Sequence, residues 1–153
     1  MKHFKDEDNN IFAYESDGSQ DAFIKAGLVP ISDEDLAAMI APTTEQLLSQ
    51  LSAARKEQER QGVTINGIRY AGDPGNRQAL QEAIALMDDA GLTEFESWKD
   101  SDNIFHANHP LADVRDAYRA IGARRSQLIA AEGEYAAQII AGTLTDLTEV
   151  VWP

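Results

Sequence analysis

The sequence predicts an α+β fold in which β-hairpins alternate with helices. Strand-forming residues come in pairs joined by polar turns, and the clearest pair spans residues 63–70 around Asn66-Gly67. That dipeptide tolerates the positive φ angles of a type I′ turn. Stretches with helical periodicity follow the pairs, and the longest covers residues 110–141. Because single strands do not alternate with single helices, we do not expect a parallel sheet.

The chain is expected to have three parts. The first is a small N-terminal β-hairpin module over residues 1–41. The second is a connector helix over residues 42–61. The third is an α+β C-terminal domain over residues 62–153, in which two β-hairpins alternate with helices and a long helix comes last.

In the N-terminal module, residues 2–5 and 11–14 form a hairpin around a polar turn. Residues 27–31 are expected to be extended, because the residue before Pro30 avoids the helical region. Ser32 then acts as the N-cap of a short helical segment.

The connector helix begins at a capping box formed by Thr43 and Gln46 and ends at Gly62. Its first half has leucines on one side, whereas residues 55–60 are all polar. We therefore expect the first half to pack against another element and the second half to lie in solvent.

In the C-terminal domain, the Asn-Gly hairpin leads into a helix that Asp73-Pro74 opens and Gly91 closes. A second hairpin follows over residues 95–107. Pro110 then opens the last helix.

That last helix carries a stripe of residues at alternating spacings of three and four, as in a coiled-coil seam. Arg125 and Glu132 stand where an uninterrupted core would be apolar. The sequence favours packing of the stripe against the protein's own elements. The alternative is self-association, with the two charges setting the register. The stripe consists of Leu111, Val114, Tyr118, Ile121, Arg125, Leu128, Glu132, Tyr135 and Ile139.

The composition is that of an ordinary globular protein. The chain has 153 residues, of which 43% are hydrophobic and 25% charged. No apolar run approaches the roughly 20 residues of a membrane-spanning helix. The first ten residues lack the apolar stretch of a signal peptide, so we expect the chain to stay in the compartment that made it. There is no cysteine, so a metal site would have to use His, Asp or Glu.

The formal net charge is −13, from 26 acidic and 13 basic residues. Such a surface repels phosphate backbones, so nucleic-acid binding is not expected. An acidic inhibitor that mimics DNA is the alternative to an ordinary acidic protein. However, the acids come in short clusters broken by Lys and Arg, unlike an array at phosphate spacing.

One cluster, His106 and His109 with Asp113, has the residue types of a metal site. It lies at a turn into a helix, where an i, i+3 pair need not converge, and polar turn residues are the commoner explanation. The serines lack the nucleophile elbow Gly-x-Ser-x-Gly, and no glycine-rich loop has a phosphate-binding pattern. The sequence therefore predicts no enzyme, no cofactor and no metal.

Three aromatic residues are candidates for binding a partner protein. Phe12 and Tyr14 belong to the second strand of the N-terminal hairpin. Trp152 is either folded back onto the domain or offered to a partner. Trp98 falls inside a predicted strand, and we expect it in the core.

Two stretches of the chain carry recognisable combinations of motifs. Lys2-His3-Phe4, residues 11–14 and residues 27–32 together resemble the start of phage tail-fibre assembly proteins. From about Ala53 the chain is similar to a domain of unassigned biochemical function at the C-termini of tail-fibre-associated phage proteins. The matching residues in that second stretch are Arg55, residues 62–69, Trp98-Lys99, Asp102-Asn103, residues 142–145 and Trp152-Pro153.

The resemblance implies a protein that helps a tail fibre fold or trimerise and that in some systems stays bound at the fibre tip. Its partner would be the tail-fibre protein, with no nucleic acid and no membrane involved. It would act in the host cytoplasm during assembly, or remain in the virion as a structural component. In better-understood assembly chaperones the opening segment precedes a different C-terminal domain, so their fibre-binding residues do not transfer to this chain.

Overall fold

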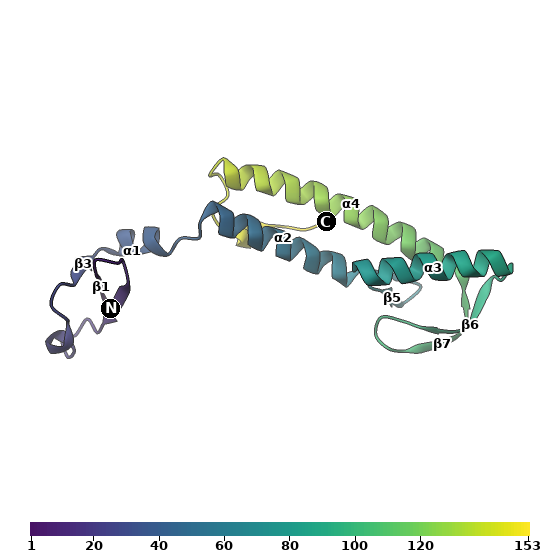
Figure 1. The fold of residues 1–153 in the computed structure, drawn as a ribbon, viewed down its shortest axis with the longest axis horizontal. Coiled ribbons are helices and arrows are strands. Elements are labelled where there is room, and N and C mark those ends of the chain that lie inside the picture. The colour runs from purple at the N-terminus through teal and green to yellow at the C-terminus, as the bar shows by residue number, and fades with distance from the viewer. The chain divides into compact units, whose positions relative to one another are not determined.

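The computed structural model describes residues 1–153, which form two compact units (Figure 1). Unit 1 is Met1–Thr43 and unit 2 is Thr44–Pro153. Helices and antiparallel strand pairs follow one another along the chain. The predicted α+β fold, with a small N-terminal hairpin and a long last helix, is confirmed.

Unit 1 is a three-stranded antiparallel sheet followed by one short helix. The first strand is central, with the second on one side and the third on the other. The Ser32 hydroxyl caps the helix by accepting a hydrogen bond from the Asp35 amide at 3.1 Å. The elements are β1 (Lys2–Lys5), β2 (Ile11–Tyr14), η1 (Asp21–Phe23), β3 (Val29–Ile31) and α1 (Asp33–Ile40).

Unit 2 is built on its last helix, which has 30 residues and is therefore about 45 Å long. Two shorter helices lie antiparallel to it, one along each half, as Figure 1 shows. One hairpin joins the two shorter helices, and the other leads into the long helix. The elements are α2 (Thr44–Gln61), β4 (Val63–Ile65), β5 (Ile68–Tyr70), α3 (Pro74–Ala90), β6 (Glu94–Lys99), β7 (Phe105–Pro110), α4 (Leu111–Ile140) and η2 (Leu147–Glu149).

Two hydrophobic clusters hold the shorter helices to α4. Burial of one leucine or isoleucine side chain is worth roughly 1.5–3 kcal/mol, so a few such residues fix each half. The cluster of α3 and the hairpins contains Tyr70, Leu80, Val114, Ala117 and Ile121. The cluster of α2 and the C-terminal tail contains Leu47, Leu51, Ile139 and Leu144.

Two glycines flank the β4–β5 hairpin: Gly62 precedes it, at the end of α2, and Gly72 follows it, before α3. A Cβ built on Gly62, whose φ is +71°, would lie 1.8 Å from the Tyr70 carbonyl oxygen. A Cβ built on Gly72 would lie 2.1 Å from the Glu59 carbonyl oxygen. Both neighbours are backbone atoms, so only glycine permits this close approach.

The structure differs from the sequence prediction over α2. We expected a connector whose second half lies in solvent. Instead, α2 belongs to unit 2, and Glu59 near its end is only 8% exposed. The reason is that arginines from α3 and α4 compensate this carboxylate. None of the helices is long and apolar enough to cross a membrane.

Candidate functional site

The predicted partner-binding residues Phe12 and Tyr14 lie on one face of β2, because they are two residues apart in a strand. Phe4 of β1 stands opposite Phe12 in the register. Its ring meets the Tyr14 ring edge-on, with 5.6 Å between centroids. The Lys25 ammonium lies 5.6 Å from the centroid of the Phe12 ring. We call the half-buried surface formed by Phe4, Phe12 and Tyr14 the aromatic face.

Unit 1 has no fully buried side chain. Phe23, Val29 and Ile40 are 73%, 56% and 64% exposed. Chains of about 40 residues usually need a disulfide, a metal or association with another chain to be stable. Unit 1 therefore presents apolar surface that a partner protein could bury.

Trp152 is folded back onto unit 2. Its ring meets the Tyr135 ring edge-on, with 6.2 Å between centroids, and packs against the cluster of α2 and the tail. The Tyr135 hydroxyl donates to the Val151 carbonyl at 3.2 Å and accepts from the Val151 amide at 3.1 Å. Of the two interpretations of this tryptophan, the structure shows the folded-back one, with the side chain half-buried.

The apolar stripe of α4 packs against the same chain, since most of its members belong to the two clusters. Its two charged positions face α2. Arg125 Nε lies 3.3 Å from Glu59 Oε1, and Glu132 Oε2 lies 2.6 Å from Arg55 Nε. These charges thus set the register of α2 on α4 within one molecule.

Glu59 is the centre of a charge cluster where α2, α3 and α4 meet. Its carboxylate pairs with Arg55, with Arg77 at 3.5 Å and with Arg125 at 3.3 Å. A buried carboxylate requires such compensation, because desolvation costs several kcal/mol. Arg77 also donates to the Gly72 carbonyl at 2.7 Å. The cluster therefore fastens the base of the β4–β5 hairpin to the helices.

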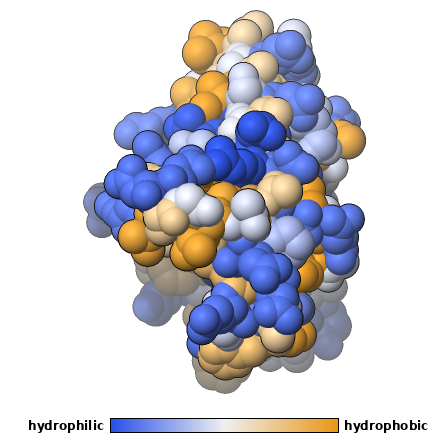
Figure 2. All heavy atoms as spheres, turned by 90° about the vertical axis from the view of Figure 1, so that its right-hand side faces the viewer, coloured by the Kyte–Doolittle hydropathy of each residue, from blue (hydrophilic) through white to orange (hydrophobic).

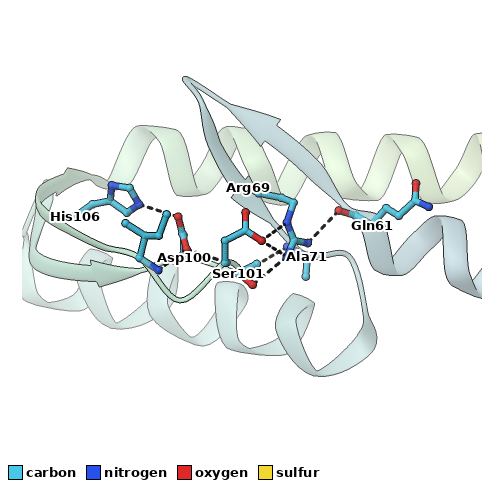
Figure 3. A network of polar contacts seen from close by, with 8 residues as sticks. Gln61, Arg69, Ala71, Asp100, Ser101 and His106 are labelled. Carbon is cyan, nitrogen blue, oxygen red and sulfur yellow. Dashed lines mark hydrogen bonds and ion pairs between the residues drawn. The ribbon is translucent and has the colours of Figure 1, made fainter.

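A second polar network joins β5 to the turn between β6 and β7 (Figure 3). The Arg69 guanidinium donates to Asp102 Oδ1 at 2.9 and 2.6 Å and to the Ser101 carbonyl at 2.9 Å. The Ala71 amide donates to the Ser101 hydroxyl oxygen at 2.7 Å. These contacts hold the two hairpins of unit 2 together.

The candidate metal ligands each have another partner. His106 Nε2 lies 2.8 Å from Asp100 Oδ2, and His109 Nε2 lies 2.6 Å from the Tyr70 hydroxyl. Asp113 accepts a hydrogen bond from the Asn66 side chain at 3.0 Å. Nowhere do three or more His, Cys, Asp or Glu side chains come together in a way that could hold a metal ion.

Burial governs the protonation of the Tyr70–His109 pair. It raises the pKa of Tyr70 to about 12, and the nearby carboxylates of Asp113 and Asp100 contribute in the same direction. Burial also lowers the pKa of His109, although the Asp113 carboxylate opposes this. Both side chains are therefore uncharged at neutral pH. The pKa of Asp100 is lowered, mainly by its hydrogen bond with His106.

Apolar side chains on the surface of unit 2 are scattered at the end that carries α3 and the β6–β7 hairpin. Figure 2 shows this end, where hydrophobic side chains lie in separate groups divided by hydrophilic ones. The exposed apolar residues of these elements are Leu86, Leu92, Ile104 and Phe105. Scattered apolar residues are normal on a protein surface and do not indicate a binding site.

Comparison with protein families assigns the larger part of the chain to one known domain family. The model of one family, described as a domain of unknown function (DUF4376), matches residues 42–151. The chain belongs to this family. No curated protein and no solved structure matches it. The expected C-terminal domain of unassigned function is thus a DUF4376 domain, and Phe12 and Tyr14 lie outside it.

The residues that carried the C-terminal resemblance have structural roles in the DUF4376 domain. Arg55 compensates Glu59, Gly62 permits a close backbone approach, and Arg69 ties two hairpins together. Trp98 packs against the core and contacts Tyr70, with 6.1 Å between ring centroids. These residues therefore identify a fold, and they do not locate a binding site.

Sequence reasoning missed the charge cluster around Glu59. Residues 55–60 are all polar, which is typical of a solvated face, and the partners Arg77, Arg125 and Glu132 lie far along the chain. One signal was available: Arg125 and Glu132 interrupt an apolar stripe, and charges in such a stripe need opposite charges on the facing helix.

Proposed function

We propose that this protein is a phage tail-fibre assembly protein, a chaperone that binds the fibre through unit 1 and assists its folding or trimerisation. The observation that carries the proposal is that unit 1 displays an aromatic face and exposed apolar residues but buries none of its side chains. The choice of the tail fibre as the partner is supported by the resemblance of residues 2–4, 11–14 and 27–32 to the start of tail-fibre assembly proteins.

The physical role follows from what an unassembled fibre exposes. Chains that must trimerise expose apolar surface and unpaired strand edges until assembly is complete, and such surfaces aggregate. Unit 1 would cover that surface at the C-terminal region of the fibre until trimerisation buries it. The net charge of −13 would keep the complex soluble.

Two other functions predict different results. A permanent component of the tail or fibre would use the same surface but stay in the particle at a fixed ratio to the fibre. An acidic DNA mimic has less support, because Glu57, Asp88 and Asp102 each pair with an arginine and so do not form a free carboxylate array.

Co-expression with a phage tail-fibre protein from the same genome tests the proposal. We expect the fibre to co-purify with this protein and the yield of soluble trimeric fibre to rise. Mass spectrometry of purified particles then separates a chaperone, which is absent or substoichiometric, from a permanent component. If no fibre co-purifies and the particles lack the protein, the proposal is wrong.

Substitution of the aromatic face should weaken the complex. We expect F12S combined with Y14S to reduce fibre capture by about tenfold or more, because aromatic residues dominate the energetics of protein interfaces. The control is L86S combined with F105S, which removes two apolar side chains from the DUF4376 domain that are 68% and 69% exposed. Capture of the fibre by the F12S/Y14S variant at the wild-type level would exclude this interface.

A further inference from the structure

The register of the sheet in unit 1 shows which backbone groups of β2 are free. The Asp6 amide donates to the Asn10 carbonyl at 3.2 Å, next to the first paired residues of β1 and β2. In an antiparallel ladder, hydrogen-bonded and non-hydrogen-bonded pairs alternate. Phe12 and Tyr14 therefore point their N–H and C=O groups at β1. Ile11 and Ala13 point theirs away from it.

The other side of the sheet agrees with this assignment. Phe4 faces Phe12 on one side and Pro30 on the other. Because Phe4 exchanges its hydrogen bonds with β2, its pairing with Pro30 is a non-hydrogen-bonded one. Proline has no N–H to donate, so it suits that position. Pro30 therefore faces the outer edge of β3 and blocks it.

The outer edge of β2 has no such protection. In the sheet, β2 pairs with β1 alone. Proteins usually protect a free edge with Lys, Pro or a bulge, whereas β2 reads Ile-Phe-Ala-Tyr. Ile11 and Ala13, whose amides and carbonyls face outward, are also exposed. The sheet thus has one blocked edge and one open edge.

Carboxylates stand at both ends of the open edge. Glu7 and Asp8 lie in the turn before β2, and Glu15 and Asp17 follow it. Unit 1 as a whole has nine acidic residues against three lysines and no arginine, which gives a net charge of −6. Two copies of unit 1 therefore repel each other edge to edge. A strand with basic ends is attracted to both ends of β2.

We propose that the free edge of β2 binds an extended segment of the partner protein that is apolar in its centre and flanked by Lys or Arg. The segment adds a strand to the sheet and exchanges backbone hydrogen bonds with Ile11 and Ala13. A groove of about 330 Å³ beside Phe12 is lined by Asp6, Glu7, Asp8 and Lys25, and its carboxylates accept one of the flanking Lys or Arg side chains. This inference rests on the proposed function, because it takes the tail fibre as the partner.

Hydrogen exchange of the full chain tests the pairing residue by residue. The full-length protein is exchanged alone and in complex with the co-expressed fibre, then quenched and read by NMR. In the free protein, the Phe12 and Tyr14 amides should exchange more slowly than those of Ile11 and Ala13. In the complex, Ile11 and Ala13 should slow by tenfold or more. If the fibre binds and these two amides stay fast, the edge is not the site.

A proline substitution tests the same edge by affinity. A13P removes an outward N–H and leaves the ladder to β1 intact, so it should weaken fibre capture by tenfold or more. The matched control is D33P, at the first position of α1, where the preceding residue is already extended and a helix needs no N–H. D33P should bind as the wild type does. If A13P captured the fibre as well as the wild-type protein does, the proposal would be overturned.

The outcomes distinguish this inference from the proposed function. If the wild-type protein captures no fibre, both fail. If it captures fibre without protection of Ile11 and Ala13, only the edge pairing fails. If sedimentation shows a dimer that A13P dissociates, the occupant of the edge is a second copy of this chain, and the proposed partner strand is wrong.

Discussion

Gly72 and Gly133 affect the stability of the same domain in opposite ways. A Cβ on Gly72 would meet the backbone of Glu59, which cannot move without shifting the end of α2. A Cβ on Gly133, inside α4, would meet nothing within 4 Å. The first glycine is required by a close approach, whereas the second only weakens a helix.

Alanine at these two positions should therefore have opposite effects on stability. G72A should lower the free energy of unfolding by about 2 kcal/mol or more, because the backbone must shift to relieve the clash. G133A should raise it by about 0.5–1 kcal/mol, the helix propensity difference between the two residues. Urea denaturation of both variants measures the effects. A neutral G72A would show that the α2–hairpin junction is looser than the structure indicates.

His109 should make stability depend on pH. It is 2% exposed, and its neighbours include Tyr70, Trp98, His106 and Asp113. Because burial lowers its pKa, the folded protein binds fewer protons than the unfolded chain once pH falls below about 6.5. The contribution of His109 to the free energy of unfolding is therefore fully present above that pH. Below it, this contribution is lost by at most about 1.4 kcal/mol per pH unit for one proton.

Urea denaturation between pH 7.5 and pH 5 measures this contribution. H109Q, which cannot titrate, should show a shallower loss of stability than the wild type, and the difference between the two pH profiles gives the contribution of His109. Asp100 does not interfere, because its pKa is lowered from 3.8 and its contribution is lost only at more acidic pH. Parallel pH profiles for the two proteins would contradict the prediction.

At the scale of elements, local signals predicted the turns and helix ends well. Asn66 and Gly67 have φ angles of +50° and +82°, as a type I′ turn requires. Asp73 accepts a hydrogen bond from the Asn76 amide at 3.0 Å as an N-cap, and Gly91 ends α3 in the left-handed conformation. Each of these features depends on residues within a few positions of each other, so the sequence alone contains the information.

Contacts between distant elements were harder to predict. The restriction on the residue before Pro30 predicted an extended segment over residues 27–31, of which β3 covers Val29–Ile31. It did not predict that β3 pairs with β1 on the side opposite β2. The polar end of α2 was expected in solvent because its arginine and glutamate partners come from α3 and α4. The open edge of β2 became visible only from the three-stranded register. The candidate residues Phe12 and Tyr14 were found by composition, whereas the edge beside them depends on the tertiary pairing.

At the scale of the molecule, the two units are stabilised in different ways. Both hydrophobic clusters lie wholly within the DUF4376 domain, and so does the charge cluster around Glu59. No side chain of unit 1 is fully buried, its sheet has short strands, and it has one short helix. The hydrophobic effect thus accounts for the folding of unit 2 but leaves unit 1 marginal by itself.

Dividing the chain after residue 41 should expose this difference. Residues 42–153 retain both clusters, so their melting temperature should stay within about 4 °C of the full-length value, a change of less than about 1 kcal/mol. A peptide of residues 1–41 should lack a cooperative transition in circular dichroism and gain strand signal only when the fibre is added, because it would then bury its apolar side chains against a partner. A peptide that melts cooperatively alone would show that unit 1 needs no partner. A large destabilisation of residues 42–153 would show that unit 1 supports the DUF4376 domain.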